Sequence, residues 1–353
     1  MSIDDQTTMI RKRRDSNMEL LRIIAMLLIM IVHADFRALD APSFSDALTE
    51  PFPTIGKLLV ESFSIIGVNV FVLLSGWYGI MVRKERFLEF VFQIFFFICF
   101  CYLIISIYNQ HFLKPNISYF LMLGEWNYWF IKCYLFLYLI SPVLNAFVEK
   151  ATKNQFFIIL ASFYLFQTIY GWIGNVSWFH NGYSGISFLG LYLLARYLRL
   201  YPCKWTQFDK KYDLFIYVVL SLINTIIAFL SMRFHLIPYK ITFFYQYTSP
   251  VVILCSVFFL LFFTKLIINY NQFINWIATS CFAIYLLHSN SYLACYYDDF
   301  IVLLYNRYDN LLFIFSVLSF IITVFISCIL IDKIRIALWR KIQCFSSFTQ
   351  TNT

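Results

Sequence analysis

The chain has 353 residues, of which 61% are hydrophobic and only 13% are charged. An average soluble domain carries about 25% charged residues, and a soluble protein of this length has too little interior to bury so much apolar surface. The composition therefore excludes an ordinary soluble enzyme and indicates an all-α integral membrane protein. The nine cysteines show no CxxC spacing, so they indicate neither a disulfide framework nor a zinc site.

Apolar runs recur along the chain, and each run of about 20 residues is long enough to cross a bilayer. We expect a bundle of about ten transmembrane helices, with boundaries set by the ends of these runs. The expected spans are 18–36, 55–82, 87–108, 126–147, 155–174, 183–200, 212–232, 247–267, 273–294 and 311–332. A further apolar run at 116–123 is too short to cross and is expected to be re-entrant or interfacial.

The distribution of Lys and Arg predicts the orientation. Of the 27 Lys and Arg residues, 19 fall on segments expected on one side, 7 fall on the other, and Arg22 lies within the first span. Because positive loops stay inside, we expect both termini in the cytoplasm. The net charge of +8 then reflects topology, and nucleic acid is not an expected partner. The expected parts are a basic cytoplasmic tail at 1–17, a membrane domain at 18–332 and a cytoplasmic tail at 333–353.

Two ionisable side chains, Arg22 and His33, interrupt the apolar first span. Burying such a group in lipid is costly, so it indicates a functional role. Eleven helical residues place the two about 16 Å apart along the axis and on nearly the same face. Arg suits phosphate groups, and His suits proton transfer near neutral pH. The alternative is that Arg22 reaches the inner surface and His33 merely ends the helix.

The second span carries polar residues at Asn69 and Ser75, which alternatively serve close helix packing. After the span, Arg83 and Arg86 are three residues apart and share a helix face. Two guanidinium groups on one face can clamp a phosphorylated ligand. The alternative is that both are ordinary positive charges of a cytoplasmic loop.

Three further residues are candidates for contact with a ligand. Glu61 is a rare carboxylate within a span, His288 lies near the outer end of the ninth span, and Trp129 follows Glu125 and Trp126 at the outer start of the fourth. Aromatic rings beside a carboxylate suit a sugar, although Trp at this depth is also typical of an interfacial aromatic belt. No HExxH, P-loop or GxSxG pattern occurs, so metalloprotease, ATPase and lipase functions have no support.

The motifs of the first two spans resemble the membrane-bound acyltransferase-3 family. In this family a basic residue precedes a His by ten intervening residues, as Arg22 precedes His33. Its second span ends in Ser-Gly and is followed by Arg-x-x-Arg, as in Ser75-Gly76 and Arg83-Lys84-Glu85-Arg86. Weaker similarities occur at Trp126-Asn127-Tyr128-Trp129, at Ser141-Pro142 and at Ala283-Ile284-Tyr285-Leu286-Leu287-His288. The resemblance covers most of the chain.

The resemblance implies transfer of an acyl group, commonly acetyl from acetyl-CoA, to a hydroxyl of a carbohydrate. In the corresponding roles, His33 is the general base or acyl relay, and arginines bind the CoA phosphates. The expected donor-binding residues are Arg22, Ser75, Arg83 and Arg86, and the expected acceptor-binding residues are Glu61, Asn69, Trp129 and His288. No metal is expected. The resemblance also implies a bacterial plasma (inner) membrane protein whose partners are a polysaccharide or lipid-linked sugar and membrane lipid.

Two other functions remain open from the residues. A transporter or flippase for a sugar or lipid-linked glycan would have corresponding broken helices in its two halves, but Pro142 and Pro250 form no such paired pattern. A glycan polymerase subunit would carry a large external loop, and the longest expected one, at 37–54, is short.

Overall fold

The computed structural model describes residues 14–112, 114, 117–124, 127–236 and 241–350. Most of the predicted tail at 1–17, together with Glu125 and Trp126, lies outside these residues. The described part of the chain is helical and contains no β-strand, so the predicted all-α class is confirmed.

The first half of the chain forms long helices joined by several short helical turns. In order, these are α1 (Ser16–Val32), η1 (His33–Arg37), α2 (Asp46–Thr49), α3 (Pro51–Ser64), α4 (Gly67–Tyr78), α5 (Lys84–Tyr108), α6 (Ile117–Phe120), α7 (Trp129–Lys150), α8 (Lys153–Phe166) and η2 (Gln167–Ile173). Local sequence explains several starts. Pro51 begins α3 at a position where a missing N–H costs nothing, and Thr152 with Gln155 forms the capping box of α8.

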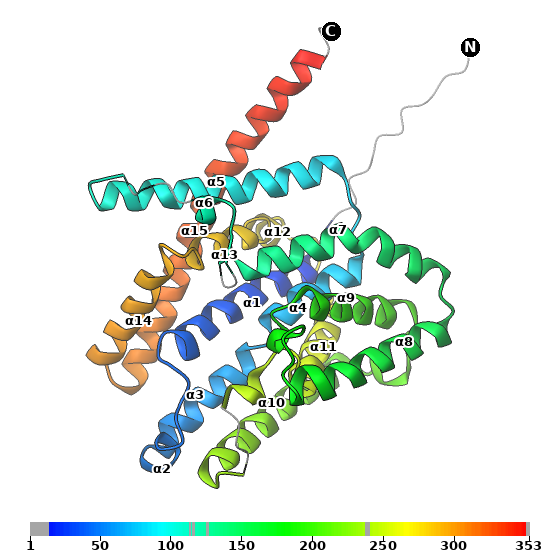
Figure 1. Cartoon of the computed structure of the whole chain (residues 1–353), viewed down its shortest axis with the longest axis vertical. Helices are drawn as coiled ribbons and strands as arrows, with labels where there is room; N and C mark the ends of the chain where they lie inside the picture. The colour runs from blue at the N-terminus through cyan, green and yellow to red at the C-terminus, as the bar shows by residue number, and fades with distance from the viewer. Residues whose placement is uncertain (1–13, 113, 115–116, 125–126, 237–240, 351–353) are drawn as a thin grey trace.

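The second half continues in the same way. Its elements are η3 (His180–Gly182), α9 (Gly185–Leu200), η4 (Lys204–Gln207), α10 (Lys210–Arg233), η5 (Ile241–Tyr245), α11 (Pro250–Thr264), α12 (Gln272–Ala278), α13 (Cys281–His288), α14 (Ala294–Arg307) and α15 (Asn310–Gln350). The long α15 lies beside α14, and its C-terminal end projects beyond the other helices (Figure 1). It runs past residue 332, where the predicted membrane domain ends.

Seven helical stretches of the described chain are long and apolar enough to cross a membrane. They are Pro51–Tyr78, Lys84–Tyr108, Trp129–Lys150, Lys153–Ile173, Lys210–Arg233, Ile241–Thr264 and Leu311–Gln343. The other three expected spans are shorter or broken: α1 has 17 residues before η1, α9 has 16, and the ninth span is divided between α12 and α13. A multi-pass helical protein is thus confirmed, but the count of ten is not.

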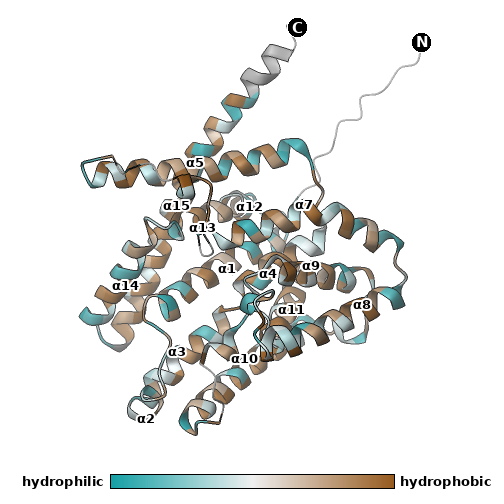
Figure 2. Cartoon of the chain, viewed as in Figure 1, coloured by the Kyte–Doolittle hydropathy of each residue, from teal (hydrophilic) through white to brown (hydrophobic). Residues whose placement is uncertain are grey.

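Hydrophobic residues cover most helices, while hydrophilic residues gather at helix ends and connections (Figure 2). The most apolar part of α15 is only 22% buried by protein, and that of α5 is 39% buried. Such helices leave most of their apolar surface outside the protein core, as expected for helices that face lipid.

Helix α1 lies at the centre of the fold and contacts α3, α4, α11, α12, α13 and α15. Its close approach to α4 depends on Gly67. A Cβ atom at this position would lie 2.8 Å from the carbonyl oxygen of Ala25 and 2.8 Å from Cγ1 of Ile29. Small residues at such contacts allow helices in lipid to pack closely. The sequence of α4 thereby determines how near its residues come to the Arg22–His33 helix.

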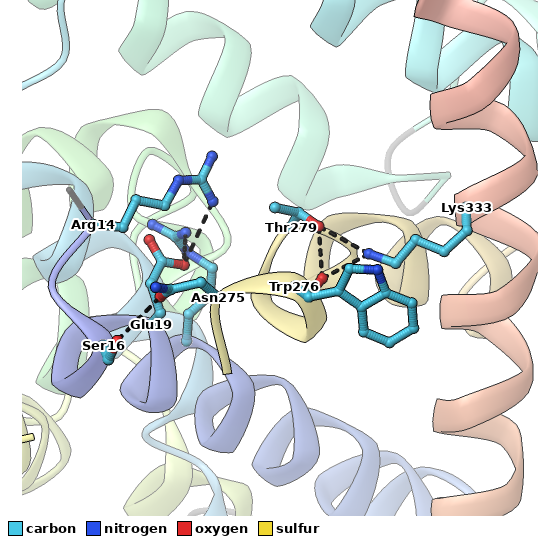
Figure 3. A network of polar contacts seen from close by, with 8 residues as sticks. Arg14, Ser16, Glu19, Asn275, Trp276, Thr279 and Lys333 are labelled. Atoms are coloured by element: carbon cyan, nitrogen blue, oxygen red, sulfur yellow. Dashed lines mark hydrogen bonds and ion pairs between the residues drawn. The ribbon is translucent and has the colours of Figure 1, made fainter. Parts of the chain in front are cut away.

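The break between α12 and α13 is stabilised by Lys333 of α15. Its Nζ donates to the carbonyl oxygen of Trp276 at 2.6 Å and to Oγ1 of Thr279 at 2.9 Å, and it lies 4.1 Å from the Trp276 ring centroid (Figure 3). A broken helix leaves carbonyl oxygens without intrahelical donors, and in a membrane these need other partners. Lys333 supplies a hydrogen-bond donor to the carbonyl oxygen of Trp276 and so allows α13 to begin in a new direction.

Candidate active site

Two cavities lie along α1. The larger, of about 590 Å³, is lined by His33, and the smaller, of about 300 Å³, is lined by Arg22. Phe71, Phe130 and Phe282 line both cavities. We call these three rings the aromatic boundary. The site thus has a basic compartment and a histidine compartment that adjoin across apolar rings.

One face of α1 serves both compartments. Arg22 lines the smaller cavity, and Met26, Ile29 and His33 line the larger one. These positions follow the spacing i, i+4, i+7 and i+11, which marks a single face of an α-helix. The shared face that the sequence predicted for Arg22 and His33 is therefore present.

The chain continues from α1 into the π-helical turn η1, where the backbone N–H of Ala38 donates to the carbonyl oxygen of His33 at 3.1 Å. This wider turn brings a cationic side chain, Arg37, to the same cavity as His33. Turns of this kind occur frequently at functional sites. Sequence analysis missed Arg37 because it was counted among external charges, although it follows His33 by four residues.

Arg37 is held in place by α14. Its Nη2 lies 2.7 Å and its Nε 3.1 Å from Oδ1 of Asp298, and its guanidinium carbon lies 5.7 Å from the Tyr297 ring centroid. Burial raises the pKa of Asp298 above its ordinary value, while the adjacent Arg37 opposes that shift. The paired Asp298 orients Arg37, which stays available as a fixed cationic donor beside His33.

His33 contacts a second histidine. Its Nδ1 lies 3.0 Å from Nε2 of His288, and Nδ1 of His288 lies 2.6 Å from the carbonyl oxygen of Ile284. His288 is only 4% exposed and is not among the residues that line the larger cavity. The structure therefore brings His288 to the site, but behind His33. Its predicted contact with an acceptor remains a prediction.

The larger cavity combines aromatic rings with polar groups. Trp129 lies 4.5 Å from Tyr183 and 6.0 Å from Tyr247 between ring centroids, and all three line the cavity. Glu61 also lines it, is 2% exposed, and its Oε2 has no hydrogen-bond partner among the described residues. Asn181 supplies an amide to the same lining. Two predicted acceptor-binding residues, Glu61 and Trp129, are thus together in the cavity that contains His33.

Asn69 has a different position. It is fully buried and does not line the larger cavity, and its Nδ2 donates to the backbone oxygen of Tyr247 at 3.1 Å. Asn69 therefore supports the Tyr247 segment of the cavity wall. A direct contact between Asn69 and a ligand stays a prediction.

The smaller cavity brings together Arg14 from just before α1, Arg22 from α1 and Arg86 from the beginning of α5, and Ser75 also lines it. Nη1 of Arg22 lies 2.5 Å from Oε2 of Glu19, and Nη1 of Arg14 lies 3.8 Å from the same oxygen. Figure 3 shows Arg14 directed toward Glu19 at the start of α1. One carboxylate thus holds two guanidinium groups at this cavity.

Arg83 is the one predicted donor-binding residue that does not line the smaller cavity. Its side chain is exposed, and its backbone N–H donates to the hydroxyl of Tyr138 at 3.2 Å, just before α5 begins. The described residues contain no group of three or more His, Cys, Asp or Glu side chains placed to hold a metal ion.

The family model of the acyltransferase domain (Acyl_transf_3) matches residues 15–332. The chain belongs to the acyltransferase-3 family. No curated protein and no solved structure matches it. The acyltransferase-3 match includes the whole lining of the larger cavity and all of the smaller cavity's lining except Arg14. The resemblance of the motifs is thereby confirmed, and the chain is an acyltransferase that spans a membrane several times; membership gives the transporter alternative no support.

Proposed function

We propose that this acyltransferase moves an acetyl group from acetyl-CoA to a hydroxyl of a surface polysaccharide or lipid-linked sugar. It would act in a bacterial plasma membrane, with both termini in the cytoplasm. One observation carries the proposal: a cavity lined by arginines adjoins a cavity lined by His33, along one face of α1.

The basic cavity supports a CoA thioester as donor. CoA carries several phosphates, and guanidinium groups bind phosphate oxygens in pairs of charge-assisted hydrogen bonds. Arg14, Arg22 and Arg86 line this cavity, and the exposed Arg83 adds to the same positive field. An extended pantetheine arm is about as long as the distance of roughly 16 Å that eleven helical residues span. Phosphates held at Arg22 would therefore let the thioester reach His33.

In the proposed reaction, His33 accepts the proton of the acceptor hydroxyl while the hydroxyl oxygen bonds to the thioester carbonyl carbon. The carbon–sulfur bond then breaks, and His33 returns the proton to the CoA sulfur, so the products are an ester and free CoA thiol. General base catalysis of this kind contributes about 10²–10⁴-fold in rate. Arg37, one turn from His33, is the donor best placed to stabilise charge on the carbonyl oxygen. These steps need no metal.

The aromatic and polar lining of the larger cavity supports a carbohydrate acceptor. Trp129 and Tyr247 present flat rings to which the apolar faces of a sugar can pack, and the carboxylate of Glu61 can accept from sugar hydroxyls. The buried Oε2 of Glu61 has no hydrogen-bond partner among the described residues, which costs free energy that an acceptor hydroxyl would recover. Membrane lipid surrounds the apolar outer helices and would hold a lipid-linked acceptor nearby.

The proposal is tested with purified protein in detergent, acetyl-CoA labelled in the acetyl group, and a lipid-linked glycan extract of the bacterium. We expect label to enter the glycan fraction as an alkali-labile ester. His33→Ala should lose this transfer at least about 100-fold while still binding acetyl-CoA. His111→Ala, a change at an exposed histidine outside both cavities, is the matched control. Full activity of His33→Ala, or no transfer by folded wild type, would contradict the proposal.

A further inference from the structure

We propose that His288 is a positioning residue that fixes the tautomer of His33, so that the unprotonated nitrogen of His33 is Nε2 and faces the larger cavity. This inference rests on the proposed role of His33 as base and adds a residue to that function.

The hydrogen bond within α13 decides the state of His288. A neutral imidazole has one N–H donor and one acceptor nitrogen. Nδ1 of His288 lies 2.6 Å from the carbonyl oxygen of Ile284, and a carbonyl oxygen only accepts. Nδ1 must therefore carry the proton. Nε2 of His288 is then the acceptor, because a doubly protonated ring at a site only 4% exposed would bury a charge at a free-energy cost.

The state of His33 follows from that of His288. Nδ1 of His33 lies 3.0 Å from the accepting Nε2 of His288, so the His33 Nδ1 must be the donor. Nε2 of His33 is consequently left with a lone pair. Ser289 Oγ lies 3.2 Å from the same His288 nitrogen, which makes the His33 contact the shorter of the two. The two histidines thus form a directed chain from His33 through His288 to the backbone of α13.

The fold keeps this chain independent of any ligand. His33 follows the last residue of α1, His288 is the last residue of α13, and these two helices contact each other. Ile284 precedes His288 by one helical turn, so the carbonyl that orients His288 belongs to its own helix. Since His288 does not line the larger cavity whereas His33 does, the free edge of His33 is the one exposed to substrate. His288 orients the base and does not touch the reacting atoms.

The first test reads the tautomer directly. The chain has five histidines, so nitrogen NMR of protein labelled at the histidine rings gives few signals. The signals that disappear in His33→Ala and in His288→Leu are those of His33 and His288. We expect wild-type His33 to be protonated at Nδ1 and unprotonated at Nε2. In His288→Leu, His33 should change to the tautomer protonated at Nε2. A His33 protonated at Nε2 in wild type, or unchanged in His288→Leu, would overturn the proposal.

A conservative variant separates orientation from packing. In His288→Gln the side-chain oxygen can take the place of Nε2 as acceptor, whereas Leu fills the space without accepting. We expect His288→Gln to keep the Nδ1–H tautomer of His33, and His111→Leu to leave it unchanged. The control residue, His111, also has its Nδ1 near a backbone oxygen, that of Asn109 at 2.8 Å. It is exposed and lies far along the chain from the site.

Kinetics give the second readout. We expect kcat to fall about 100-fold in His288→Leu, while KM and the affinity for acetyl-CoA stay unchanged. In His288→Gln we expect kcat to lie close to the wild-type value. Equal losses in both variants with an unchanged tautomer would make His288 a packing residue and overturn the proposal. The NMR result does not depend on transfer. A wild type with the expected tautomer but no transfer would contradict the proposed function alone.

Discussion

At the scale of single residues, Arg22 and His33 lie in different cavities although they share one helix face. Arg22 lines the basic cavity and is paired with Glu19 at 2.5 Å, whereas His33 lines the larger cavity and contacts His288. The three arginines that line this cavity, Arg14, Arg22 and Arg86, face two carboxylates, Glu89 in the lining and Glu19 beside it, so the balance of charge is still positive. This excess is what a polyphosphate donor would use.

Replacing Arg22 should weaken donor binding. Hydrogen bonds to charged groups contribute about 1.5–3 kcal/mol, so Arg22→Ala is expected to raise the Kd for acetyl-CoA about 10–100-fold. The salt dependence of binding should also decrease, since a charged contact is lost. Isothermal titration in detergent at two salt concentrations measures both effects.

Arg307→Ala is the matched control for Arg22. It removes the same charge from an exposed position at the end of α14, where the guanidinium lies over Tyr308 and lines neither cavity. We expect its affinity for acetyl-CoA to equal that of wild type. Equal Kd values for wild type and Arg22→Ala would show that Arg22 has no part in donor binding.

At the scale of elements, the contact of α1 with α4 and the aromatic boundary determine how the two cavities meet. Gly67 allows α4 to approach the backbone of α1, and Phe71 of α4 is one of the three rings that line both cavities. The other two rings come from α7 and α13. The boundary is therefore assembled from three helices that are distant in sequence.

Gly67→Ala should destabilise the protein. The added Cβ would lie 2.8 Å from the carbonyl oxygen of Ala25, a backbone atom that cannot move aside without shifting α1. Overpacking of this kind costs about 1–3 kcal/mol, and a lower apparent Tm in detergent is the measurement. Gly56→Ala in α3 is the matched control, since a Cβ there meets no atom within 4 Å. A Tm of Gly67→Ala at or above that of Gly56→Ala would contradict the packing argument.

The aromatic boundary should limit the size of the acyl group. Phe282→Leu removes ring volume between the two cavities, so we expect the ratio of butyryl to acetyl transfer to rise several-fold, in line with about 0.8 kcal/mol per buried CH₂. The measurement is kcat/KM for both donors. Phe258→Leu, at a partly buried Phe of α11 that lines neither cavity, should leave the ratio unchanged. An unchanged ratio of butyryl to acetyl transfer in Phe282→Leu would show that the aromatic boundary does not limit the size of the acyl group.

At the scale of the whole molecule, the number of crossings decides where the ends lie. Seven helical stretches qualify by length and composition, and an odd number would place the termini on opposite sides. The Lys and Arg distribution instead predicts an even number, with both termini in the cytoplasm. The three shorter elements, α1 with η1, α9, and α12 with α13, would then complete the crossings.

A topology reporter tests this requirement. Fused after Thr353, it should report the same side as a reporter before Met1, and that side should be the cytoplasm. The matched measurement is a reporter in the loop between α2 and η1, at residues 38–45, which should report the outside. Ends on opposite sides would show that an odd number of segments crosses and would contradict the proposed orientation.

The sequence alone determined the membrane class, the helical fold and the face of α1 that Arg22 and His33 share. Apolar composition, run length and the spacing of Arg22 and His33 are local properties, and the bilayer and helix geometry convert them directly into structure. The same reasoning found Glu61 and Trp129, which line one cavity. It did not find Arg37, whose place in the cavity lining follows a π-helical turn, and it did not foresee the break between α12 and α13.

Only the tertiary structure decided which distant residues meet. His33 and His288 are 255 residues apart, and Arg37 and Asp298 are 261 apart, so no local pattern links them. Their contacts arise because α13 packs against α1 and α14 packs against η1. Long-range pairing of this kind depends on the packing of whole helices. For that reason the sequence showed the groups that can do chemistry, and the fold showed which of them can act on one another.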